Sequence, residues 1–172
     1  MKSKLITMIL LTVLLTSRNS NCQIPTERND TLKLLLDNSK SKNKKLFLVF
    51  GWEGCGWCRI FDKYHSDPEV SNILNKYFLI TPIDIFKTKA GEELYKKFGK
   101  EGTPYWTIFN LNGEVIVDSD NGKGNVGYPA DGQEKDHYVY ALKKAAPKLT
   151  NSEIDILVNK LKEYNTKKEQ NK

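Results

Sequence analysis

The sequence predicts a single α/β domain built on a mixed β-sheet that is flanked by helices. Segments with helical and strand-like patterns alternate along the chain, which indicates a sheet with helices on both faces and at least one parallel pair of strands. Asn112-Gly113, a dipeptide typical of tight hairpins, separates the strand-like residues 104–110 from 114–118 and makes the predicted sheet mixed. Removing the first 22 residues from the 172 leaves 150, which suits one domain with one core.

The first 22 residues are expected to lie outside this domain. Lys2 and Lys4 precede Leu5–Leu15, an apolar run without charged residues. A membrane-spanning helix needs about 20 apolar residues, so this shorter run is typical of a secretory signal peptide instead. Two interpretations stay open: cleavage after Cys22, or a lipoprotein signal that ends before Cys22 and leaves it as a lipid-modified N-terminus. Either predicts export, to the periplasm or outside the cell, with a membrane anchor only if Cys22 is lipidated.

The charge of the chain does not indicate a nucleic-acid partner. The net charge of +6 comes from 27 basic and 21 acidic residues. Residues 1–22 hold three of the basic residues and no acid, so the remainder carries 24 minus 21, or +3. Several of these positive charges fall in residues 167–172, which are expected to be a solvated tail after a domain spanning 23–166.

The first predicted elements are a helix and a buried strand. Asp30 is expected to cap a helix over residues 31–40, where leucines cluster on one side. Lys45–Phe50 is apolar and aromatic, as a buried strand is, and residues 57–65 have a helical pattern. Two cysteines lie at the junction between this strand and this helix.

A second strand follows a short helix. Asp67 and Pro68 are typical of a helix cap and a first helical position, so a helix is expected to begin there. Tyr77–Ile85 predicts the second strand, and Pro82 indicates that this strand lies at an edge or an end of the sheet. The next helix is expected to end at Gly99.

The C-terminal part of the chain is predicted to be a loop and two helices. Ser119–Gln133 is glycine-rich and indicates a loop, either a mobile connection or a lid or partner contact. Glu134–Ala146 is helical in pattern. Thr150 and Glu153 have the spacing of a capping box and predict the start of the last helix.

Cys55 and Cys58 are the predicted catalytic residues. Cys55 is expected at a helix N-terminus, where unpaired N–H groups and the helix dipole stabilise a thiolate and lower the pKa of the thiol. Cys58 follows by one turn on the same face, within reach of a disulfide bond with Cys55. Cys55 would then attack a substrate disulfide and Cys58 would resolve the mixed disulfide. A bridge that closes so short a loop constrains the unfolded chain little, so a purely structural role is disfavoured.

The segment VFGWEGCGWC, residues 49–58, resembles the active-site segment of the thioredoxin superfamily. The resemblance covers roughly Lys45–Val117 and includes Thr103-Pro104, a dipeptide that precedes a strand and an Asn-Gly turn, as in thioredoxins. It implies a thioredoxin-like fold, here with an extra C-terminal helix, and a thiol–disulfide oxidoreductase without a cofactor. It also implies protein disulfide or dithiol substrates and an upstream redox partner protein.

The resemblance also implies where a substrate binds. It implies a cis Thr103–Pro104 bond packed beside the cysteines. Proline offers no N–H, so the adjacent backbone of Thr103 is left to pair with an extended substrate strand. The candidate substrate-binding residues are Trp57, Thr103, Pro104 and Tyr105.

The sequence departs from the thioredoxin pattern at two places. Val49 occupies the position of a buried aspartate that moves protons for the second cysteine in thioredoxin, so either another acid serves or the deprotonation of Cys58 is slower and more dependent on solvent. Glu53 is the first candidate for this proton shuttle, the alternative being an ordinary exposed loop glutamate. Between the cysteines, Trp57 replaces a proline, which leaves the helix start less rigid and adds an aromatic surface that can touch a substrate.

Other functions would use some of the same residues. A zinc site would need His65 and His137 beside the two cysteines, but their distant positions in the sequence predict no metal site. A binding or chaperone module would instead use the aromatic side chains near the site, which are Trp52, Trp57, Tyr105 and Trp106. A disulfide oxidant or isomerase would share the same cysteines. The family resemblance favours the reduction of disulfides in exported proteins.

Overall fold

The computed structural model describes residues 27–130 and 132–169. The helices and strands follow in the order α1 (Glu27–Ser41), β1 (Lys45–Gly51), α2 (Gly56–Ser66), α3 (Pro68–Leu74), β2 (Phe78–Asp84), α4 (Lys89–Phe98), β3 (Tyr105–Phe109), β4 (Val115–Asp118), α5 (Gly132–Ala145) and α6 (Asn151–Glu169). The expected signal peptide over residues 1–22, with Cys22, lies outside the described residues. Helix α6 continues to Glu169, so the first three residues of the expected charged tail are helical.

The sheet has four strands in the order β2-β1-β3-β4. Strand β1 pairs in parallel with β2 and antiparallel with β3, and β3 and β4 form the antiparallel hairpin. The mixed sheet is therefore confirmed. Pro82 lies on β2 opposite Val49, and β2 is an edge strand, as the proline predicted.

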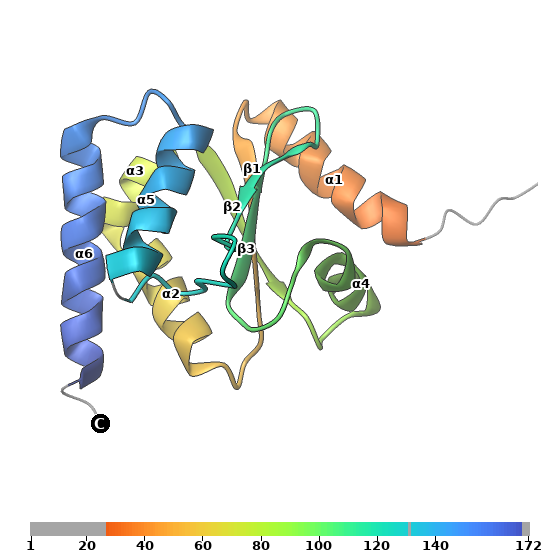
Figure 1. The fold of residues 1–172 in the computed structure, drawn as a ribbon. Helices are drawn as coiled ribbons and strands as arrows, with labels where there is room; N and C mark the ends of the chain where they lie inside the picture. The colour runs from red at the N-terminus through yellow and green to blue at the C-terminus, as the bar shows by residue number, and fades with distance from the viewer. Residues whose placement is uncertain (1–26, 131, 170–172) are drawn as a thin grey trace, which may run out of the picture.

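Two hydrophobic cores lie on opposite faces of the sheet. Figure 1 shows α1 and α4 on one face and α2, α3, α5 and α6 on the other. Along β1 the side chains alternate, so that Phe47 and Val49 join the core under α2, α5 and α6, whereas Leu48 and Phe50 join the core under α1 and α4. Strand β1 is thus buried on both faces, and the chain that leaves its end enters the segment that carries the cysteines.

Helix caps agree with the sequence prediction at two positions and differ at one. The Asp67 side chain accepts hydrogen bonds from the backbone N–H groups of Glu69 and Val70, at 2.9 and 3.4 Å. Thr150 and Glu153 form the reciprocal capping box expected before α6. The prediction that Asp30 caps α1 is wrong, because α1 begins at Glu27 and Asp30 lies in its first turn.

Within residues 27–130 and 132–169, no helix combines the length and the apolar character that crossing a membrane requires.

Candidate active site

Cys55 is the N-cap of α2. Strand β1 ends at Gly51, and a turn closed by a hydrogen bond from the Cys55 N–H to the Trp52 carbonyl brings the chain to the helix. Cys55 has extended backbone angles, φ −80° and ψ 107°, and its Sγ accepts a hydrogen bond from the N–H of Cys58 at 3.1 Å. The sulfur therefore occupies the place that an oxygen of serine or aspartate fills at other N-caps. This is the helix N-terminus expected to stabilise a thiolate.

The two cysteines form a disulfide, with an S–S distance of 2.05 Å. Both are mostly enclosed, since only 7% of Cys55 and 5% of Cys58 is exposed. The structure therefore represents the oxidised form of the pair.

The Thr103–Pro104 peptide bond is cis, as the family resemblance implies. The carbonyl oxygen of Thr103 lies 3.5 Å from Cys55 Sγ, across 48 residues of sequence. Pro104 directly precedes β3. The fold thus brings the substrate-facing backbone expected from the sequence beside the first cysteine.

Tyr105 does not present its side chain to a substrate. Its ring is fully buried and belongs to the core under α1 and α4, because the residues of β3 alternate between the two faces of the sheet. The prediction of Tyr105 as a substrate-binding side chain therefore needs correction, and only its backbone lies near the site. Trp106 is buried in the opposite core, where its Nε1–H donates to the Gly127 carbonyl at 2.9 Å.

Two pairs of aromatic rings flank the cysteine segment. Trp57, which is 40% exposed, stacks on Tyr128 of the glycine-rich loop. Trp52 and Phe86 are both exposed and meet edge to face, with ring centroids 5.7 Å apart. An apolar surface therefore lies at two sides of the disulfide.

A cavity of about 310 Å³ lies beside Cys58. Val49, the position of the missing aspartate, forms part of its wall together with Gly51. The charged residues that line this cavity are Glu53, Arg59, Asp62, Asp84 and Lys87. Acids therefore reach the neighbourhood of Cys58 from α2, from the loop after β1 and from the end of β2, although position 49 on β1 is apolar.

Asp62 is the acid that the sequence analysis did not identify. It follows Cys58 by four residues on α2, a spacing that places two side chains on the same side of a helix. Desolvation of its carboxyl raises the pKa of Asp62 above its usual value, although Asp62 is an exposed residue. Glu53, the acid predicted from the sequence, lines the same cavity with an exposed side chain, while its backbone carbonyl accepts a hydrogen bond from the Arg59 side chain. The i, i+4 spacing from Cys58 was the available signal for Asp62.

The two histidines do not join the cysteines. His65 Nε2 lies 3.2 Å from the Tyr138 hydroxyl, its ring centroid lies 4.1 Å from that of Phe61, and burial lowers the pKa of His65 to about 3. His137 Nε2 donates to the Asp118 carbonyl at 2.8 Å, and its ring stacks on Trp106. Among the described residues, no three His, Cys, Asp or Glu side chains are grouped as metal ligands.

Comparison with known proteins yields one family and several distant relatives. A curated relative, an uncharacterized protein of Caenorhabditis elegans, is 26% identical over 102 residues, which is 53% of this chain but only 14% of the relative's own length. A disulphide isomerase from Xylella fastidiosa Temecula1 covers 78% of this chain and 92% of its own, with 21% identity and a TM-score of 0.48. A thioredoxin from Thermus thermophilus covers 67% and 88%, with 20% identity and a TM-score of 0.47.

The C-terminal domain of Neisseria meningitidis DsbD, in its oxidised form, covers 52% of this chain and 80% of its own, with 23% identity and a TM-score of 0.42. The family model described as a thioredoxin-like domain matches residues 32–120, just over half of the chain, and includes both cysteines and the cis-proline. The chain therefore belongs to the thioredoxin-like family, and with its Cys55–Cys58 pair it is by class a thiol–disulfide oxidoreductase.

Proposed function

We propose that this protein is exported and reduces disulfide bonds in other exported proteins, with Cys55 as the attacking nucleophile and Cys58 as the resolving thiol. One observation carries the assignment of roles: Cys55 is the N-cap of α2 and its Sγ accepts the Cys58 N–H at 3.1 Å. Once the pair is reduced, the same N–H and the positive end of the helix dipole favour a thiolate on Cys55.

The reaction balances over two exchange steps. In the reduced enzyme, the Cys55 thiolate attacks one sulfur of a substrate disulfide, which forms a Cys55–substrate disulfide and releases the other substrate sulfur as a thiolate. Cys58 then loses its proton and attacks Cys55 Sγ, which releases the second substrate thiol and forms the disulfide seen here. Two electrons pass from the pair to the substrate, and an upstream dithiol protein must return two electrons to the pair.

The substrate is a polypeptide that carries a disulfide. An extended chain that pairs with the backbone of Thr103 would bring its sulfur beside Cys55, because the Thr103 carbonyl lies 3.5 Å from Cys55 Sγ. The exposed Trp57 extends the contact surface, whereas Pro104 is itself buried and acts through the backbone that it shares with Thr103. Tyr105 contributes backbone only.

Asp62 is the proposed proton acceptor for Cys58, with Glu53 as the alternative. Cys58 is buried and Val49 supplies no acid, so its thiol needs a base within the adjoining cavity. A carboxyl whose pKa is raised toward neutral pH is a better proton acceptor than an ordinary surface aspartate.

Export is supported by the basic and apolar pattern of residues 1–22. Mass spectrometry of the N-terminal peptide from the native host distinguishes the alternatives. A free N-terminus at residue 23 means cleavage after Cys22, and a diacylglycerol-modified Cys22 means a lipoprotein. A chain that still begins at Met1 would contradict export.

Single-cysteine variants test the roles of the two thiols. Cys55→Ser is expected to abolish disulfide reduction, whereas Cys58→Ser is expected to accumulate mixed disulfides with its substrates, and the double variant is the control for background trapping. A Cys55→Ser protein that reduces a disulfide at the parental rate would contradict the assignment. The direction of electron flow is read from the equilibrium of the pair in graded thiol buffers: a value near −270 mV supports a reductase, and one near −120 mV an oxidant.

A further inference from the structure

The backbone that faces the substrate lies outside the sheet. Pairing between β1 and β3 begins at Tyr105 opposite Phe50, so Thr103 and Pro104 come before the first paired residue of β3. Pro104 has no N–H, which leaves its carbonyl as its only backbone hydrogen-bonding group. Whatever binds that carbonyl therefore fixes the orientation of this segment.

Asn125, in the glycine-rich loop, binds the Pro104 carbonyl. Its Nδ2 donates to the Pro104 oxygen at 3.1 Å, while its Oδ1 accepts from the Gly127 N–H at 2.9 Å and from the Ser119 hydroxyl at 2.7 Å. A carbonyl can only accept and a backbone N–H can only donate, so the side-chain amide has one orientation that satisfies both. Asparagine fits this position because it carries a donor and an acceptor at the end of one short side chain.

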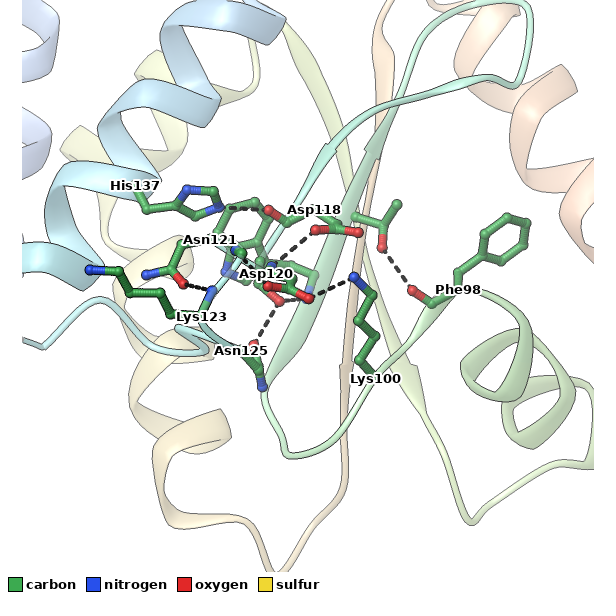
Figure 2. Close-up of polar contacts among 12 residues, drawn as sticks. Phe98, Lys100, Asp118, Asp120, Asn121, Lys123, Asn125 and His137 are labelled. Carbon is green, nitrogen blue, oxygen red and sulfur yellow. Dashed lines mark hydrogen bonds and ion pairs between the residues drawn. The ribbon is translucent and has the colours of Figure 1, made fainter.

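The loop is itself joined to the sheet and to the segment before the proline. Ser119 is fully buried, and its hydroxyl accepts the Trp106 N–H at 3.1 Å. Asp120 forms an ion pair with Lys100 at 2.6 Å. Figure 2 shows Asn125 and Asp120 on this loop and Lys100 reaching Asp120 from the segment that leads to the proline.

The packing between the loop and the proline leaves little space. A Cβ at Gly127 would lie 3.1 Å from the Pro104 oxygen, and a Cβ at Gly102 would lie 3.2 Å from Asn125 Nδ2. Both glycines have positive φ angles, +55° and +88°, that other residues rarely adopt. Close approach and glycine backbone together keep the amide within hydrogen-bonding distance of the proline.

We propose that Asn125 is a positioning residue for polypeptide substrates, because it holds the Thr103–Pro104 backbone in the orientation in which a substrate strand pairs with it. The inference rests on the proposed function and adds a residue outside both the cysteine segment and the proline segment. This role for Asn125 predicts different effects on two kinds of substrate. A protein disulfide needs the oriented backbone, whereas a small aromatic disulfide reacts with Cys55 without pairing to a strand.

Asn125→Asp tests the positioning role of Asn125, because aspartate has nearly the same shape as asparagine. The substitution keeps the acceptor for Ser119 and Gly127 but places a second acceptor against the Pro104 carbonyl. We expect the KM for insulin disulfide reduction to rise roughly tenfold, as for the loss of one buried hydrogen bond. The kcat/KM for dithiobis(nitrobenzoate) and the redox equilibrium of the Cys55–Cys58 pair should stay at parental values.

Two further variants complete the experiment. Asn121→Ala is the matched control, since Asn121 lies in the same loop and its side chain accepts only from the nearby Lys123 N–H among the hydrogen bonds of the described residues; it should behave like the parent. Asn125→Ala removes the donor without adding charge and gives the same comparison if the aspartate variant does not fold. A parental KM for insulin, or an equal loss with both substrates, would overturn the role of Asn125. A parent that reduces neither substrate would refute the proposed function instead.

Discussion

The indole ring of Trp57 stacks on the phenol ring of Tyr128, with centroids 5.3 Å apart and planes inclined by 22°. Trp57 is 40% exposed and Tyr128 only 4%. The aromatic surface next to the cysteines therefore rests on a buried ring from the glycine-rich loop. Part of this loop, including Val126 and Tyr128, packs into the core.

Replacement of Tyr128 should change the environment of Trp57. Tyr128→Leu removes the stacked ring, and we expect it to lower the free energy of unfolding by about 1 to 2 kcal/mol. Tyr128→Phe is the matched control, because the Tyr128 hydroxyl is buried and has no hydrogen-bond partner among the described residues. The phenylalanine variant should be as stable as the parent or more so. Thermal unfolding and tryptophan fluorescence measure both effects, and equal destabilisation by both substitutions would contradict a role for the ring.

Asp62→Asn should slow the resolution of the mixed disulfide. Without the Asp62 carboxylate, Cys58 must lose its proton to solvent or to another acid of the cavity, and we expect the release step to be slower by roughly 100-fold. Release in single-turnover experiments should fall in the parent as the pH drops through the raised pKa of Asp62, and this inflection should vanish in the variant. Glu53→Gln is the comparison variant. If it, and not Asp62→Asn, removes the inflection, Glu53 is the acid.

His65 should make the protein less stable in mild acid. Burial lowers the pKa of His65 to about 3 in the folded chain, so between pH 6.5 and 3 the unfolded chain binds the proton more readily. The stability that the neutral ring contributes is complete above pH 6.5 and is lost as the pH falls, by about 2 kcal/mol at pH 5. Denaturant titrations at pH 7 and 5 measure this difference. His65→Phe should show a smaller difference in stability between pH 7 and pH 5. If the variant keeps the parental pH dependence, His65 is not its cause.

Glu153→Gln should destabilise the start of α6. The Glu153 carboxylate accepts from the Thr150 N–H at 2.9 Å and pairs with Lys76 at 2.8 Å, and the hydrogen bond from Lys76 lowers the pKa of Glu153 to about 2. Loss of the charge should cost about 1 kcal/mol at pH 7, through the ion pair with Lys76 and the helix dipole, because the glutamine oxygen can still accept from the Thr150 N–H. Because the folded-state pKa is lowered, this contribution is present above pH 4.5 and is lost as the pH falls toward 2. Urea unfolding at pH 7 checks the value. Lys76→Met removes the ion pair but keeps the hydrogen bond between Thr150 and Glu153, so its free energy of unfolding measures the ion pair alone.

Local signals in the sequence predicted most helices and strands and both segments of the site, the cysteine pair and Thr103-Pro104. The strand before Cys55, the Asp67 cap and the edge position of Pro82 each follow from neighbouring residues, and the structure confirms them. The Thr-Pro dipeptide was identified through its family context. These features were predictable because each depends on a few consecutive residues.

Contacts across the chain were not predictable in this way. Asn125 reaches Pro104 across 21 residues, and nothing in the glycine-rich segment distinguishes it from Asn121. Tyr105 was predicted to bind substrate, although the alternation of side chains along β3 places its ring in the core under α1 and α4. Which face of a strand is buried depends on the helices packed against it, and these come from distant parts of the sequence.

The order of the strands places the two cysteines in contact with different regions of solvent. Cys55 adjoins Thr103, which precedes β3, whereas the cavity beside Cys58 is walled by residues of β2, on the other side of β1. In the proposed binding mode, a polypeptide that pairs with Thr103 would leave the β2 side uncovered. Water can therefore exchange protons with the second thiol while the mixed disulfide persists, so the size of the bound protein need not limit the speed of its release.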